Sequence, residues 1–242
     1  AQSPSSPAAD ELPAWERALV VVAHPDDESF GLGGVIDTLV RSGTRVSVLC
    51  LTAGEGSTLG TTPRAPDEPA SDLATVRAAE LDLAARRLGI HGTLLRSHPD
   101  GGLAERPSDL VADVAAAVDA IRPDGLLVFG LGGGVTGHPD HEAASQAAMD
   151  VAAAEGLPVL EWCLPGSVAD SLNREFGAAF TGFDESELTI TVTVDRARQR
   201  RAIDAHVSQA VPGSVLWRRL ELLGDQEHLR LTHPAPPHED HP

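Results

Sequence analysis

Short β-rich runs alternate along this chain with Ala- and Leu-rich stretches of helical periodicity, and this alternation constrains the fold more than any other feature. It predicts strands at residues 18–23, 45–51, 92–96, 125–129, 157–162 and 188–194, and helices at residues 33–41, 72–88, 108–121, 139–154 and 196–207. Elements in this order typically form parallel strands that helices cover on both faces. We therefore expect an α/β fold: a Rossmann-like, doubly wound, mostly parallel sheet in a single domain, with its site outside the carboxyl ends of the strands.

The two ends of the chain differ in composition from the part between them. Residues 1–14 and 232–242 are rich in Pro, Ser, Ala or His, and they predict a flexible N-terminal arm and a disordered tail. The folded domain is expected at residues 15–231. Within it, residues 52–70 and 165–187 lack clear periodicity, and loops of that length usually form walls or lids of a functional site.

The chain is strongly acidic, because 36 Asp and Glu residues against 18 basic residues give a formal net charge of −18. Such a surface repels polyanions, so we expect neither nucleic acid nor a membrane as a partner. No apolar run reaches the roughly 18 residues that a membrane span needs, and the first residues lack the order of a signal peptide. We therefore expect a cytoplasmic protein in which Cys50 and Cys163 are reduced, buried thiols.

Two polar clusters follow predicted strands. The first is Ala23-His24-Pro25-Asp26-Asp27-Glu28, and the second is Gly137-His138-Pro139-Asp140-His141-Glu142. Several carboxylates and an imidazole directly after an apolar strand are costly unless they have a partner, and a divalent cation is the obvious one. The carboxyl ends of parallel strands meet at one edge of a sheet, so the clusters together predict a metal site. The second cluster alone would more simply be a helix cap with Pro139 at the first helical position.

At these residues the sequence resembles the PIG-L, or LmbE-like, family of zinc-dependent N-acetylglucosaminyl deacetylases, whose signature combines Ala-His-Pro-Asp-Asp-Glu with a later His-Pro-Asp-His. Weaker similarities extend the resemblance over residues 18–210. They are Thr52-Ala-Gly-Glu55, Arg77-x-x-Glu80 with Leu88-Gly89, Asp100-Gly-Gly-Leu103 and Ala205-His206-x-Ser208-Gln209.

The resemblance implies that His24, Asp27 and His141 bind one Zn²⁺ per chain, with Fe²⁺ as the alternative metal in the cell. Two imidazoles and one carboxylate leave a coordination position open, which is the arrangement of a catalytic rather than a structural zinc. Such a metal polarises an amide carbonyl and lowers the pKa of bound water.

The resemblance also implies the catalytic groups. Asp26 is free of the metal and is expected to be the general base, while His138 stabilises the oxyanion and Asp140 favours the charged form of His138. Either His138 or the protonated Asp26 delivers a proton to the departing amine. The sequence departs from some family members at Thr136, where they carry a Tyr that assists the oxyanion.

Three further positions are expected to bind substrate by the same resemblance: Arg77, Asp100 and His206. Each also has a simpler interpretation, because Arg77 can pair with Glu80, Asp100 can form a turn, and His206 can lie in the core. Glu28 is expected to cap a helix or to orient His24.

A dinucleotide-binding protein is the main rival from another class. The motif Gly132-x-Gly134-x-x-Gly137 follows a predicted strand, and Glu161 ends the next one. However, Asp140 and Glu142 place negative charge where a pyrophosphate would bind. Non-haem iron chemistry and a metal-free scaffold fit less well, and a serine hydrolase lacks its Gly-x-Ser-x-Gly elbow.

We therefore expect a zinc-dependent hydrolase that removes an N-acetyl group from an N-acetylglucosamine-type amino sugar in a small molecule or natural-product glycoconjugate. The alternative within this class is an amidase that cleaves a larger acyl group. The expected partner is the amino-sugar substrate, and self-association into a homo-oligomer is left open.

Overall fold

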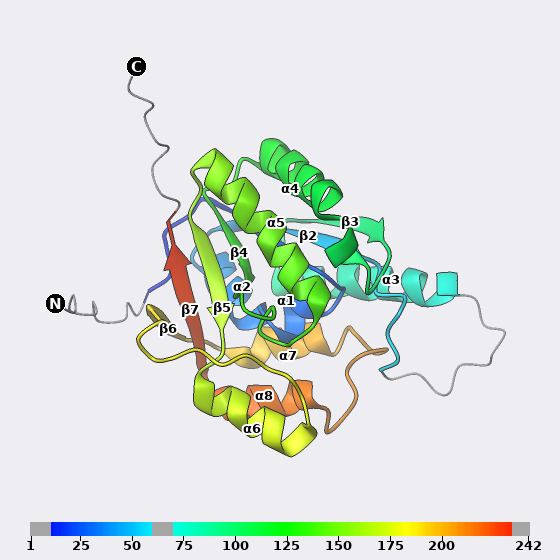
Figure 1. Cartoon of the computed structure of the whole chain (residues 1–242), viewed down its shortest axis with the longest axis vertical. Coiled ribbons are helices and arrows are strands. Elements are labelled where there is room, and N and C mark those ends of the chain that lie inside the picture. The colour runs from blue at the N-terminus through cyan, green and yellow to red at the C-terminus, as the bar shows by residue number, and fades with distance from the viewer. Residues whose placement is uncertain (1–10, 60–69, 234–242) are drawn as a thin grey trace.

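The computed structural model describes residues 11–59 and 70–233, which form a seven-stranded sheet with helices on both faces (Figure 1). The strand order is β3-β2-β1-β4-β5-β7-β6. The strands are β1 (Arg17–Val22), β2 (Arg45–Thr52), β3 (Gly92–His98), β4 (Gly125–Phe129), β5 (Val159–Cys163), β6 (Ile190–Thr193) and β7 (Gln226–Thr232). Strands β1 to β5 are parallel, whereas β7 is antiparallel to both of its neighbours. The expected α/β fold class is thus confirmed.

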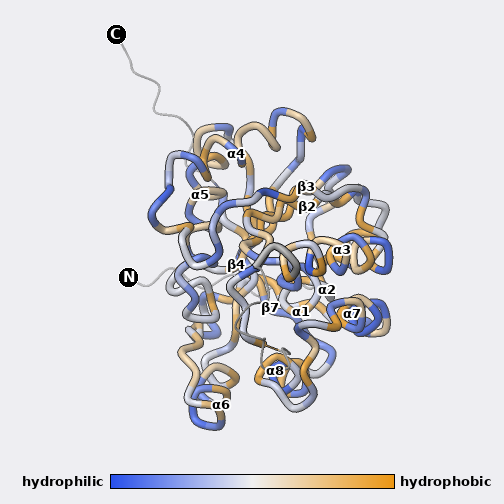
Figure 2. Tube along the Cα trace, turned by 90° about the vertical axis from the view of Figure 1, so that its right-hand side faces the viewer, coloured by the Kyte–Doolittle hydropathy of each residue, from blue (hydrophilic) through white to orange (hydrophobic). Residues whose placement is uncertain are grey.

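The helices divide between the two faces of the sheet. They are α1 (Asp27–Phe30), α2 (Gly33–Arg41), α3 (Ala70–Leu88), α4 (Pro107–Ile121), α5 (Pro139–Glu155), α6 (Gly166–Phe176), α7 (Arg196–Ile203) and α8 (Val215–Leu223), with a 3₁₀ turn at Leu103–Glu105. Figure 2 shows α4 and α5 on one side of the strands and α3 and α7 on the other. None of the described helices is both long and apolar enough to cross a bilayer.

Strand β1 shows why the central strands are largely apolar. Its residues Ala18, Val20 and Val22 belong to the core cluster that includes α2 and α3, whereas Leu19 and Val21 belong to the cluster beneath α4 and α5. Because successive side chains point to opposite faces, a strand covered on both faces buries all of them. This burial fixes the ends of the strands, and with them the polar clusters that follow.

The structure corrects the predictions for the C-terminal third. Residues 165–187 were expected to be a loop without clear periodicity, but they contain α6, an amphipathic helix that buries Ala169 and Leu172 on one face. The helix expected at residues 196–207 ends at Ile203. Neither α8 nor β7 was predicted, and the sequence of β7 alternates polar and apolar residues because it is only partly buried.

The order of the strands reverses between β1 and β4, which lie side by side. In a doubly wound sheet this reversal opens a crevice at the carboxyl ends of the two strands. The two polar clusters follow these two strands, so the fold brings them together. Residues 1–10, 60–69 and 234–242 lie outside the described part, so the terminal arm, the tail and most of the loop expected at residues 52–70 stay predictions.

Candidate metal centre and active site

The turn after β1 directs two adjacent carboxylates into one cavity. Asp26 has a φ angle of 117°, which a non-glycine residue rarely adopts, and α1 begins at the next residue. The backbone N–H of Asp26 donates to Oε2 of Glu28 at 3.0 Å. The guanidinium of Arg77 donates to the carbonyl oxygens of Pro25 and Gly54, and its Nη2 lies 3.4 Å from Oδ1 of Asp26. These contacts hold a strained turn of the kind found at active sites.

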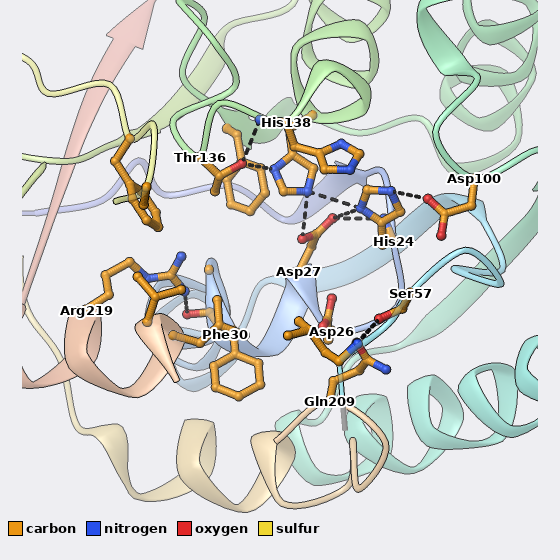
Figure 3. A pocket seen from close by; sticks show the side chains of 18 of the residues that line it. His24, Asp26, Asp27, Phe30, Ser57, Asp100, Thr136, His138, Gln209 and Arg219 are labelled. Atoms are coloured by element: carbon orange, nitrogen blue, oxygen red, sulfur yellow. Dashed lines mark hydrogen bonds and ion pairs between the residues drawn. The ribbon is translucent and has the colours of Figure 1, made fainter. Parts of the chain in front are cut away.

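Three potential ligand atoms converge where the two clusters meet (Figure 3). Nδ1 of His24 lies 3.1 Å from Nε2 of His141, which lies 3.2 Å from Oδ1 of Asp27. Nδ1 of His24 is 3.6 Å from Oδ2 of the same carboxylate. Atoms at these separations fit around one ion bound at about 2.0–2.2 Å from each.

The remaining ring nitrogens contact groups that set the tautomers. Nε2 of His24 lies 3.0 Å from Oδ1 of Asp100 and 3.4 Å from Oδ2 of Asp140. Nδ1 of His141 lies 2.6 Å from the hydroxyl oxygen of Thr136. Carboxylates next to Nε2 of His24 keep the proton on that nitrogen and leave Nδ1 free to bind a metal. When the hydroxyl oxygen of Thr136 accepts a hydrogen bond from Nδ1 of His141, the proton stays on Nδ1. Nε2 of His141 is then likewise free to bind a metal.

The electrostatics of this cluster also favour a cation. Burial raises the pKa of Asp27, but the nearby His141 and His24 imidazoles outweigh it and hold the pKa well below its usual range. Burial lowers the pKa of His24, but Asp100, Asp140 and Asp27 together raise it well above its ordinary value. The carboxylates thus attract a positive charge between the rings, and a metal ion would take the place of that proton.

Two wider groupings of possible ligands surround the same imidazole. His24 is grouped with His138 and His141, and also with Asp100 and Asp140, with the ligand atoms of each group within 4.8 Å of one another. In the triad of His24, Asp27 and His141, the three separations between possible ligand atoms range from 3.1 to 3.6 Å. Its two nitrogens and one carboxylate form a donor set that a divalent metal accepts.

Asp26 lines the same cavity but is not part of the triad. Burial raises the pKa of its carboxyl to about 6, an effect that the Arg77 guanidinium opposes and the neighbouring Asp27 supports. A carboxylate whose pKa lies near 6 is well suited to accept and return a proton near neutral pH.

His138 and Asp140 differ from the expected arrangement. Nδ1 of His138 accepts the backbone N–H of Asp140 at 3.2 Å, which caps α5. The Asp140 carboxylate instead accepts the N–H groups of Gly101 and Leu103. Burial and the nearby His24 and His141 rings lower the pKa of His138. Asp140 raises the pKa of His138 and so favours its charged form, as expected, but burial and the two rings outweigh this effect. A neutral ring with its proton on Nε2 fits the contacts.

The three residues expected to bind substrate lie in different surroundings. Arg77 and Asp100 line the cavity, although each already contacts the turn or the triad. His206 is fully buried, is absent from the cavity wall and lies 2.7 Å from Oε1 of Glu28. The substrate-binding prediction for His206 is thus wrong in this structure, because its ring supports Glu28 beneath the Asp26 turn. It also lies beyond α7 rather than on a helix.

The glycine-rich loop after β4 binds a carboxylate of the chain itself. The backbone N–H groups of Gly132, Gly133 and Gly134 donate to Oε2 of Glu142 at 3.0, 2.9 and 2.7 Å. Successive backbone N–H groups of this kind form an anion-binding concavity. Glu142 therefore fills the place where a dinucleotide pyrophosphate would bind.

Glu161, the other residue of the dinucleotide hypothesis, has a structural role. Its carboxylate accepts hydrogen bonds from Nε and Nη2 of Arg230 at 3.0 and 2.7 Å and from the hydroxyl of Thr232 at 2.6 Å. These bonds join β5 to β7, so Glu161 is not available to bind a ribose.

One feature of the cavity was missed at the sequence level. Arg219 on α8 lines the cavity wall, yet it is only 1% exposed. The sequence does contain a sign of it. Arg219 is a charged residue in the apolar stripe of α8 that Leu216, Leu220 and Leu223 form at helical spacing. A charged residue in an apolar helix stripe is unusual unless it has a partner.

The family profile described as "PIG-L: GlcNAc-PI de-N-acetylase" matches residues 19–152. A 1D-myo-inositol 2-acetamido-2-deoxy-alpha-D-glucopyranoside deacetylase of Nakamurella multipartita is 30% identical over 252 residues, covering 85% of this chain and 83% of its own. A probable N-acetyl-alpha-D-glucosaminyl L-malate deacetylase 2 of Bacillus cereus is 32% identical over 195 residues, covering 80% and 83%.

Solved structures show the same fold at lower sequence identity. The N,N'-diacetylchitobiose deacetylase of Pyrococcus horikoshii has a TM-score of 0.62 and 22% identity, with 93% of this chain and 88% of that chain covered. This similarity concerns the fold alone, so the chemistry has to be argued from the site.

Proposed function

The chain belongs to the PIG-L family, and from this membership and its site we propose that it is a metal-dependent N-deacetylase. Its substrate is an N-acetylglucosamine-type amino sugar in a small molecule or natural-product glycoconjugate. The observation that carries the proposal is the convergence of His24, Asp27 and His141 on one side of the cavity, with the free carboxylate of Asp26 in the same wall. Relatives named as deacetylases of an inositol and a malate conjugate support the substrate class.

We propose zinc as the metal, held by Nδ1 of His24, Nε2 of His141 and the Asp27 carboxylate. Two nitrogens and one carboxylate are ligands that zinc accepts, and Fe²⁺ is the alternative. When bound, the metal supplies Lewis acidity, which polarises the amide carbonyl and makes the attacking water more acidic.

Asp26 is proposed to move the proton. Its carboxylate takes a proton from the attacking water as the oxygen–carbon bond forms, and it returns that proton to the nitrogen as the carbon–nitrogen bond breaks. The products are then acetate and a free amine. Arg77 keeps the carboxylate oriented through the contact at Oδ1, and the pKa of about 6 permits both transfers.

His138 is proposed to stabilise the oxyanion. Because Nδ1 accepts the N–H of Asp140, Nε2 carries the proton and can donate it as a hydrogen bond to the former carbonyl oxygen. Thr136, at the position where some relatives carry Tyr, contacts His141 instead. The oxyanion role of that Tyr is therefore not taken over by Thr136 in this geometry.

The test of this proposal is the release of acetate from N-acetylglucosaminyl conjugates by the zinc-loaded protein. We expect acetate and a free amine in equal amounts, and no turnover after chelation of the metal. A matched conjugate with a longer N-acyl chain separates the deacetylase from the amidase alternative. Preferred release of the longer acid would overturn the acetyl assignment, and release of neither acid would overturn the proposed reaction.

A further inference from the structure

The guanidinium of Arg219 is the feature of the cavity that the proposed reaction leaves unused. Nη2 donates to the carbonyl oxygen of Phe30 at 2.6 Å. Nε is buried without a partner, and Nη1 has no acceptor among the described residues. A buried charge with so few partners is costly unless another group completes its surroundings.

No carboxylate of the described chain lies within ion-pair distance of Arg219. The nearby buried acid Glu227 is already bound, because it pairs with Arg196 and accepts the indole N–H of Trp162. Trp162 itself lies 5.0 Å from the Arg219 guanidinium and packs against it. Burial lowers the pKa of Arg219 to about 10, so the group remains charged at neutral pH.

Arg77, the second arginine in the cavity wall, already has partners within the protein. Arg77 donates to two backbone carbonyls and contacts Asp26. Of the two arginines that line the cavity, only Arg219 therefore lacks a carboxylate partner in the described part of the chain.

Arg219 also lies apart from the expected reaction centre. Figure 3 shows its side chain projecting from α8 on the opposite side of the cavity from Asp100 and Ser57. Its surroundings include apolar residues of the cavity wall, namely Phe30, Val215 and Leu216. A charge pair formed against such apolar side chains is poorly screened by water and is correspondingly strong.

We infer that Arg219 binds a carboxylate on the group attached to the amino sugar, so that the enzyme selects acidic conjugates. This inference rests on the proposed function, since the acetamide has to lie at His24, Asp27 and His141 while the attached group extends toward α8. Nη1 and the second hydrogen of Nη2 are the donors left for the carboxylate, and a planar guanidinium suits the two oxygens. The cavity of about 500 Å³ has room for a sugar and a small attached acid.

The test compares two substrates that differ only in charge. These are an N-acetylglucosaminide of a small hydroxy acid and its primary carboxamide, each supplied to the zinc-loaded enzyme. We expect kcat/KM to be at least about tenfold higher for the acid, mainly through a lower KM, which corresponds to about one charge-assisted hydrogen bond. Equal kcat/KM values for the two substrates would overturn the inference.

Variants assign the preference to the residue. Arg219→Gln should remove the preference for the acid while the carboxamide is still turned over, and Arg219→Lys should restore part of it. Arg218→Gln is the matched control, because Arg218 is the next residue of α8 and pairs with Glu175 and Glu221 outside the cavity. An undiminished preference in Arg219→Gln would overturn the assignment.

Two outcomes need separate measurements. If Arg219→Gln does not fold, inhibition of carboxamide turnover by the free hydroxy acid and by its amide in the unmodified enzyme decides the question. If the enzyme releases acetate from neither substrate, the proposed function has failed rather than this inference. Calorimetric binding of the two compounds to the zinc-loaded protein then decides, because it requires no turnover: tighter binding of the acid supports the inference, and equal binding overturns it.

Discussion

At the scale of single residues, the strained turn at Asp26 offers a clean test of the general base. Asp26→Asn should lower kcat by about 10²–10⁴-fold, because the amide cannot accept the proton of water. Asn tolerates a positive φ better than Ala does, so the turn should persist. Metal content measured by elemental mass spectrometry should be unchanged. Asp109→Asn on the exposed face of α4 is the control, and full activity of Asp26→Asn would exclude the residue as the base.

Thr136 gives a second prediction at this scale. Thr136→Val removes the hydroxyl that contacts Nδ1 of His141 and should weaken zinc binding by about 10–100-fold, since an unsupported ring loses its orientation. Thr136→Ser keeps the hydroxyl and should bind zinc as the original protein does. Competition with a chromophoric chelator measures both variants. Unchanged affinity in Thr136→Val would mean that the ring is held by packing alone.

At the scale of elements, the loop between β4 and α5 depends on one carboxylate. Glu142→Gln replaces the acceptor of three loop N–H groups and should cost about 1–3 kcal/mol of local stability. Hydrogen exchange of Gly132 to Gly134 should become faster, and kcat should fall because His138 follows this loop. Glu155→Gln at the other end of α5 should change neither. If hydrogen exchange of the loop is unchanged in Glu142→Gln, the carboxylate does not hold the loop in place.

The pairing of β5 with β7 gives a prediction that depends on pH. Burial raises the pKa of Glu161, but Arg230 and Thr232 outweigh it and hold the pKa below the ordinary value of 4.5. A carboxyl with a lowered pKa stabilises the fold above its unfolded-state value, and this contribution is lost as the pH falls. Glu161→Gln should therefore lower the free energy of unfolding by about 1–3 kcal/mol at pH 7. Urea titrations should show that the difference in unfolding free energy between the original protein and Glu161→Gln becomes smaller below pH 4.5. A difference that does not change with pH would refute the link between the ionisation of Glu161 and stability.

At the scale of the whole molecule, zinc binding and folding should be coupled. Zinc at about 100 times its dissociation constant should stabilise the fold by about 2.7 kcal/mol, because the ligands converge only in the folded chain. Scanning calorimetry should show a higher Tm with zinc, and His141→Ala should abolish the increase. His91→Ala, an exposed histidine outside the cavity, should keep it. Equal Tm values with and without zinc would contradict the proposed centre.

The sequence predicted the five parallel strands, β1 to β5, because the central ones are buried on both faces and are therefore largely apolar. The polar clusters at two strand ends predicted a metal site, and the family resemblance supplied the ligand triad that we propose for it. The sequence did not predict β7, whose alternating polar and apolar residues pair with strands far away in the chain. It also did not predict α6, which buries only two residues. Arg219 was missed for a related reason: its place in the cavity wall, without a carboxylate partner among the described residues, exists only after α8 packs beside α1.

The position of β7 in the sheet has a consequence for the order in which a growing chain acquires its parts. Strand β6 pairs only with β7 in the described sheet, and β7 follows it along the chain with α7 and α8 between them. The ligand triad and Asp26, by contrast, all precede residue 142. During synthesis the residues that we propose as metal ligands therefore leave the ribosome before the wall that carries Arg219. Those residues that we propose for catalysis are made first, and the one that we propose for selecting the substrate is made last.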